Sequence, residues 1–117
     1  MEVNLDLHCD LTAYLLQPNS SPNGDVRCSV DKLFAGNVKM QVMAFYSATE
    51  KGSVDEVKEQ LKHYRNLLNL PGVYEFSPDK AELKDGLGII AAVENASGLC
   101  EENQPIVDAF KNLDWLS

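Results

Sequence analysis

Two segments far apart in the sequence carry side chains that are suited to binding a metal ion. The first, Asn4-Leu-Asp-Leu-His-Cys-Asp10, alternates apolar and polar residues and ends in a His-x-Asp pair. Residues i and i+2 of a strand project from the same side, so His8 and Asp10 are expected to lie together at a strand end. The second, Gly88-Ile-Ile-Ala-Ala-Val-Glu94, is an apolar run that ends in a carboxylate. Zinc accepts such nitrogen and oxygen ligands, and this combination of residues predicts a zinc site.

The strands that must position these residues follow from the apolar pattern. Strand-like runs cover Glu2 to His8, Val38 to Tyr46 and Leu87 to Glu94, and helical patterns separate them. This alternation is typical of βαβ units, so we expect an α/β fold with about three parallel strands. The second and third runs are almost continuously apolar, which indicates central strands covered on both faces. Because ligands bind at the carboxyl edge of such sheets, the three candidate ligands are expected at one edge.

The helical segments have recognisable ends. The clearest helix runs from Val54 to Leu70, where apolar residues recur at steps of three and four, and Ser53 with Glu56 forms the pattern of a capping box. Shorter helices are expected after Ser29 through Phe34, from Ser77 to just before Asp85, and from Pro105 onward.

The two candidate metal-binding segments belong to a longer pattern. Asp6-Leu-His-Cys-Asp-Leu11, the stretch from Arg27 to Tyr46, and Ile89-Ile-Ala-Ala-Val-Glu-Asn-Ala-Ser-Gly98 follow one another along the chain. In order and approximate spacing they resemble the N-terminal third of the membrane (renal) dipeptidase family of zinc metallopeptidases. That family is built on an amidohydrolase-like (β/α)8 (TIM) barrel. The resemblance implies that residues 1–117 form a single partial domain, the N-terminal part of such a barrel, because a closed barrel needs about 250 residues.

The resemblance also implies roles for the candidate ligands. The family site holds two zinc ions: residues matching His8 and Asp10 bind one of them, and the carboxylate matching Glu94 bridges it to the second. A bridging carboxylate holds the two ions roughly 3.5–4 Å apart, and the water between them becomes a nucleophile. The family takes two further histidines and a catalytic aspartate from later strands. No catalytic residue is therefore assigned within this chain, and the general base is expected beyond Ser117.

The residues of this chain alone predict a metal site with few protein ligands. The only other histidine, His63, lies in the middle of a predicted helix, and no motif match supports it as a ligand. A catalytic zinc site typically has three protein ligands and an open position. His8, Asp10 and Glu94 are therefore expected to hold at most one ion, and to hold it weakly.

Each candidate residue also has a purely structural interpretation. A bare His-x-Asp occurs by chance in many proteins, and Glu94 can simply reach solvent at the end of its strand. A carboxylate that closes an apolar run is costly to bury unless it is paired or metal-bound, which favours the ligand interpretation. Cys9 alternates to the opposite side of the strand and is expected to pack in the core. Gln41 lies in an apolar run and needs a buried hydrogen-bond partner.

Three functions remain open at this point. As part of a zinc-dependent dipeptidase, the chain supplies the N-terminal metal ligands for hydrolysis of a dipeptide by metal-activated water and is inactive alone. As a non-catalytic remnant or split-gene fragment, it depends on a complementary C-terminal fragment or on homo-oligomerisation, because it leaves strand edges and apolar surface uncovered. As a small α/β binding module, it unfolds cooperatively as a monomer without metal. Related phosphoesterases and nucleases usually have His-x-His where this chain has Asp10.

Charge and composition narrow the partners. The formal net charge of −8 disfavours a nucleic-acid partner, because phosphates attract clustered Lys and Arg. No run approaches the roughly 18 apolar residues of a membrane span, so no membrane partner is expected. Three cysteines without an export signal fit a reducing compartment, and we expect a cytoplasmic protein.

Overall fold

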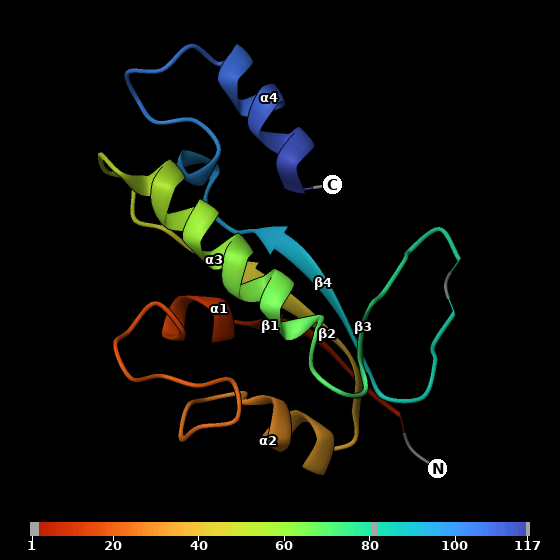
Figure 1. Cartoon of the computed structure of the whole chain (residues 1–117). Coiled ribbons are helices and arrows are strands. Elements are labelled where there is room, and N and C mark those ends of the chain that lie inside the picture. Colours follow the sequence, from red (N-terminus) through yellow and green to blue (C-terminus); the bar gives the residue numbers. More distant parts are fainter. Residues whose placement is uncertain (1–2, 81, 117) are drawn as a thin grey trace.

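Four parallel strands form one open sheet in the order β1-β2-β4-β3. The strands are β1 (Asn4–Cys9), β2 (Val38–Phe45), β3 (Val73–Glu75) and β4 (Leu87–Val93). The computed structural model describes residues 3–80 and 82–116, and Figure 1 shows the arrangement of its elements. The prediction of an α/β fold with a parallel sheet is confirmed, and the sheet is not closed into a barrel.

Helices connect β1 to β2 and β2 to β3, and others follow β4. They are α1 (Leu11–Tyr14), α2 (Val30–Ala35), α3 (Ser53–Leu67) and α4 (Val107–Leu116), and a short 3-10 helix, η1, covers Ala96–Gly98. The Ser29 hydroxyl caps α2 by accepting a hydrogen bond from the backbone of Lys32, as its position before the apolar pattern predicts. Among the described residues no helix is long and apolar enough to cross a membrane.

The predicted strands occur with small differences at their ends, but the expected number of three was wrong. Glu2, which the first predicted strand includes, lies outside the described residues. The additional strand, β3, pairs only with the first half of β4, through Val73 to Leu87 and Glu75 to Ile89. Three residues are too short for an alternating pattern to be recognised, so pairing with β4 defines this strand.

The helix predicted from Ser77 to just before Asp85 does not form in the described residues, which here exclude residue 81. A turn at residues 78–80 is followed by irregular chain. The Phe76 N–H donates to the carbonyl of Ile89 at 2.8 Å, and the Lys84 N–H donates to the Tyr74 hydroxyl at 2.8 Å. The bond to Tyr74 satisfies a backbone N–H that a helix would otherwise pair internally, and the Phe76 bond continues the pairing with β4 up to the start of the predicted helix.

The predicted capping box of α3 is also wrong. Gly52, with a φ of 95°, is the residue that precedes the helix, and without a side chain it offers no side-chain cap. The Ser53 hydroxyl instead lies 2.7 Å from both the carbonyl and the hydroxyl oxygen of Ser97. The Glu101 carboxylate accepts a hydrogen bond from the Gly52 N–H, so a distant carboxylate satisfies the start of the helix.

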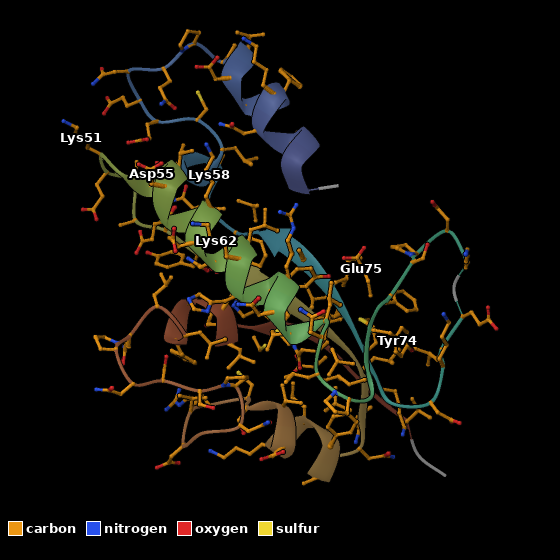
Figure 2. The ribbon with its side chains drawn as sticks, viewed as in Figure 1. Lys51, Asp55, Lys58, Lys62, Tyr74 and Glu75 are labelled. Carbon is orange, nitrogen blue, oxygen red and sulfur yellow. The ribbon has the colours of Figure 1, made fainter. Side chains whose placement is uncertain are left out.

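The core lies between the sheet and the helices on one of its faces. Figure 1 shows α3 lying across the sheet. Its buried Tyr64 packs edge-to-face on Phe45, with ring centroids 5.6 Å apart. The opposite side of α3 carries exposed charges, including Asp55, Lys58 and Lys62 (Figure 2). The core also includes further residues in or beside α1, α2, α3, β2 and β4: Leu11, Leu15, Val30, Leu33, Met43, Val57, Leu61, Leu67, Leu87 and Ile89.

The other face of the sheet is uncovered toward its carboxyl edge. Because Met43 and Phe45 point into the core, alternation places Val42 on the opposite face, where its partner on β4 is Ile90. On the neighbouring strand, Leu5 and Leu7 are 55% and 74% exposed. This open face is apolar.

Candidate metal centre

The three predicted ligands come from the ends of two strands that flank β2. His8 lies near the end of β1, Asp10 immediately precedes α1, and Glu94 immediately follows β4. Both β1 and β4 pair with β2, so their carboxyl ends lie one strand apart. The Glu94 N–H donates to the carbonyl of Phe45 at 3.1 Å, which continues the β2–β4 pairing up to the ligand itself.

A bulge, rather than regular alternation, directs His8 toward Asp10. The pairing of β1 with β2 shifts register between Asp6 and Cys9, and the His8 N–H donates to the Asp6 carboxylate at 3.0 Å. Bulges commonly re-aim a side chain near a functional site. Asp10 itself has left the strand, with φ −105° and ψ 26°. The prediction that the pair lies together therefore holds for a reason that differs from simple period-two spacing.

The ligand atoms of His8, Asp10 and Glu94 all lie within 4.8 Å of one another. His8 Nε2 is 3.1 Å from Asp10 Oδ1 and 3.6 Å from Glu94 Oε2. Ligands of a tetrahedral zinc ion with bonds of 2.0–2.2 Å are roughly 3.4 Å apart. The two separations from His8 Nε2 are close to this value and fit ligation of a single ion.

The group is accessible and carries net negative charge. The side chains of His8, Asp10 and Glu94 are 53%, 37% and 44% exposed. Two carboxylates beside a single imidazole attract a divalent cation, and solvent can reach the remaining coordination positions. Exposure also weakens the attraction, because water screens each charge.

A hollow of about 310 Å³ adjoins the group. Asp10 and Glu94 form part of its lining, and Ala13, Tyr14 and Tyr46 complete it. Tyr14 ends α1, and Tyr46 follows β2 at the same carboxyl edge. The sequence analysis missed both tyrosines. Tyr46 is the last residue of a predicted strand and Tyr14 comes a few residues after the His-x-Asp pair, and these positions were the signal that would have found them.

A buried amide holds the two sides of this hollow together. Gln60 of α3 accepts a hydrogen bond from the Tyr46 N–H at 3.1 Å and donates one to the Tyr46 carbonyl at 2.6 Å. The Thr12 hydroxyl of α1 lies 3.1 Å from Gln60 Oε1 and 3.2 Å from the Ala44 carbonyl. Gln60 and Thr12 are both fully buried. This network joins α1, α3 and the end of β2.

Two other predictions concern residues beside the group. Cys9 is 6% exposed and belongs to the core, as predicted. Gln41 is fully buried, and its Nε2 donates to the carbonyls of Asp6 at 3.4 Å and Val42 at 3.1 Å. These carbonyls are the partners that the sequence could not name. Its Oε1 has no hydrogen-bond partner among the described residues.

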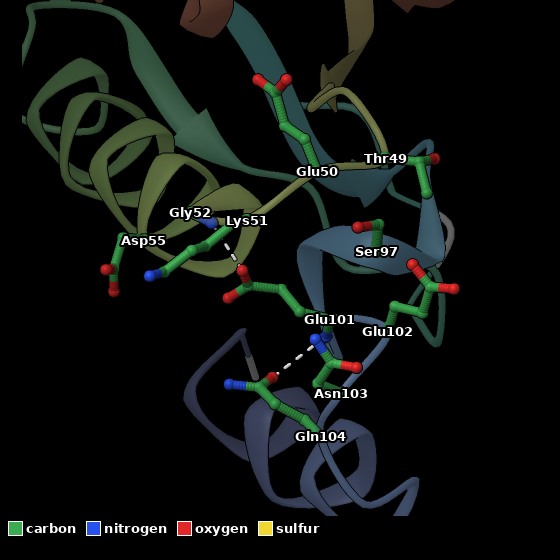
Figure 3. A pocket seen from close by; sticks show the side chains of 10 residues that line it. All are labelled: Thr49, Glu50, Lys51, Gly52, Asp55, Ser97, Glu101, Glu102, Asn103 and Gln104. Carbon is green, nitrogen blue, oxygen red and sulfur yellow. Dashed lines mark hydrogen bonds between the residues drawn. The ribbon is translucent and has the colours of Figure 1, made fainter.

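His63 does not join the group, since it lies on α3 and the ligand cluster consists of the three predicted residues alone among those described. A larger hollow of about 440 Å³ lies at the start of α3 (Figure 3). Its carboxylates include Glu50, Asp55, Glu101 and Glu102, but it offers no histidine or cysteine, and Glu101 already accepts the Gly52 N–H. The nitrogen-containing group at the carboxyl edge is therefore the stronger candidate for zinc.

Compared with models of known protein families and with curated proteins, the chain matches none. The geometry and chemistry of the candidate metal centre must therefore carry the functional argument.

Proposed function

We propose that His8, Asp10 and Glu94 bind one zinc ion and that the chain contributes this site to a zinc-dependent dipeptidase. The observation that carries the proposal is the convergence of three ligand atoms within 4.8 Å from residues far apart in the sequence. Their separations fit one tetrahedral ion. The resemblance of the surrounding segments to the membrane dipeptidase family supports the choice of zinc and of a dipeptide substrate.

The residues of the chain have defined roles in this proposal. Bound zinc would polarise the substrate carbonyl and make a water ligand nucleophilic near neutral pH. His8 would supply the nitrogen ligand, Asp10 would hold the ion from the start of α1, and Glu94 would contribute a carboxylate to the same site. The resemblance assigns neither the remaining histidines nor the general base to a residue of this sequence. In this proposal, residues 1–117 therefore bind one ion and hydrolyse no dipeptide.

Zinc titration of the purified chain tests this proposal. We expect one zinc ion per chain by competition with a chromogenic chelator, and an at least tenfold weaker affinity in Glu94→Gln, because the amide lacks the charge of the carboxylate. Glu102→Gln, in the hollow at the start of α3, is the matched control and should retain the wild-type affinity. Equal affinities of wild type, Glu94→Gln and His8→Ala would refute the metal centre.

The open sheet face favours a second candidate function, that of a fragment that acts only with a complementary C-terminal segment. Leu5 and Leu7 expose their side chains there, and β4 is paired on its outer side only as far as Ile89. A further parallel strand would pair with the second half of β4, and an element packed on the open face would cover Leu5 and Leu7. Sedimentation velocity tests this candidate: concentration-dependent self-association of the isolated chain supports it, whereas a stable monomer with a cooperative unfolding transition supports a self-sufficient binding module.

A further inference from the structure

The hollow beside the metal centre is lined partly by residues that are not candidate metal ligands. When the carboxylates of Asp10 and Glu94 face a bound ion, the surface left for a ligand consists of Ala13, Tyr14 and Tyr46. A tyrosine offers an apolar ring with a polar tip, so this surface is mainly aromatic. We propose that it is a side-chain subsite, in which Tyr14 and Tyr46 contact an aromatic or other large apolar side chain of a small ligand bound to the metal. This inference rests on the proposed metal centre.

The size of the hollow limits what it accepts. Its volume of about 310 Å³ is at the lower end of the range for small-molecule sites, about 300–1,000 Å³. A single side chain with its adjoining backbone fills such a space, whereas an extended peptide does not. The subsite therefore suits a substrate of dipeptide size.

The lining of the hollow offers an acidic side chain no partner. It contains no lysine or arginine, and the surface left beside a bound ion is apolar and aromatic. Aromatic pairs add about 0.5–1.5 kcal/mol beyond the area that they bury. An aromatic side chain is therefore favoured over an acidic one of similar size.

The hydrogen bonds of Gln60 make this subsite a preformed one. Both backbone polar groups of Tyr46 are bound to the Gln60 amide. The same amide contacts Thr12, two residues before Tyr14. The backbone of Tyr46 and the helix that carries Tyr14 are thus attached to the buried side of α3, and positioning by rigid elements lowers the entropy cost of binding.

Hydroxamic acids test the inference, because they bind zinc through the same group and differ only in their side chain. The zinc-loaded chain is titrated calorimetrically with acetohydroxamic acid and with phenylacetohydroxamic acid. We expect the phenyl compound to bind about tenfold more tightly, which corresponds to about 1.4 kcal/mol. In Tyr46→Ala this affinity ratio should fall to about one, whereas Tyr46→Phe, which keeps the ring, should retain it.

The outcomes separate the two proposals. A chain that binds zinc and both hydroxamates with equal affinity retains the metal centre and refutes the subsite. A ratio that survives in both Tyr46→Ala and Tyr14→Ala also refutes it, since the preference would then arise elsewhere. A chain that binds no zinc overturns both proposals.

Discussion

Two fully buried glutamines differ in how well their side chains are hydrogen-bonded, and this difference predicts opposite sensitivities to the same substitution. Gln60 makes three short contacts, two with the Tyr46 backbone and one with Thr12. Gln41 makes one bond of 3.1 Å and one of 3.4 Å, and its Oε1 has no partner among the described residues. Methionine has a similar length and shape without the amide, so Gln60→Met and Gln41→Met remove mainly hydrogen bonds.

The magnitudes follow from the groups that each change leaves behind. Gln60→Met leaves the N–H and C=O of Tyr46 unpaired at a half-buried position. Each unpaired buried group lowers the free energy of unfolding by about 1–3 kcal/mol. Because water can partly reach these groups, we expect a loss of about 2–4 kcal/mol in the free energy of unfolding. Gln41→Met removes a buried acceptor that is already unpaired. The stability gained by removing this acceptor offsets the stability lost with the two hydrogen bonds of Nε2. We expect a change within about 1 kcal/mol.

Urea unfolding followed by circular dichroism measures the free energy of unfolding of both variants. An unchanged dependence of this free energy on urea concentration shows that the native state is intact. The ratio of hydroxamate affinities provides a second readout for Gln60→Met, since it reports the position of the tyrosines. Equal losses of stability in the two variants would refute the reasoning, because burial alone would then set the cost.

Two further predictions concern a thiol and two glycines. The hydrogen bond from the Cys9 thiol lowers the pKa of Cys28 to about 7 from an ordinary 9.0. Alkylation of Cys28 by iodoacetamide should therefore reach half its maximal rate near pH 7. Cys9→Ala should move that midpoint to higher pH, and an unchanged midpoint would contradict the assigned cause. Gly52 and Gly86 both have positive φ, but only at Gly86 would a Cβ collide with the backbone of a neighbouring turn. Thermal unfolding should therefore show a loss of about 1–2 kcal/mol for Gly52→Ala and a clearly larger loss for Gly86→Ala, whereas equal losses would mean that φ alone matters.

The central part of the fold was readable because its signals are local. The apolar runs of β2 and β4 reflect burial, which most residues of β2 and the first three residues of β4 experience, so the pattern is long and continuous. Ser29 caps α2 through a bond to Lys32, a contact within one turn of chain. In each case the physical cause lies within a few residues of the pattern that revealed it.

The elements that sequence reasoning missed depend on distant partners. The short strand β3 exists through its pairing with β4, and the segment after it follows bonds to Ile89 and Tyr74 instead of forming a helix. The start of α3 is satisfied by Glu101 and not by the predicted capping box. Local propensity is a weak guide wherever such tertiary contacts compete with it.

The sequence by itself determined which residues can bind a metal ion, since His8, Asp10 and Glu94 were identified from their types and from the strand ends that they occupy. Only the tertiary structure decided that their ligand atoms lie within 4.8 Å of one another. It also decided that two tyrosines and a buried glutamine complete the surroundings. The physical reason is that chemical character belongs to single residues, whereas distances between strand ends depend on pairing, register and the bulge at His8, which many remote contacts set together.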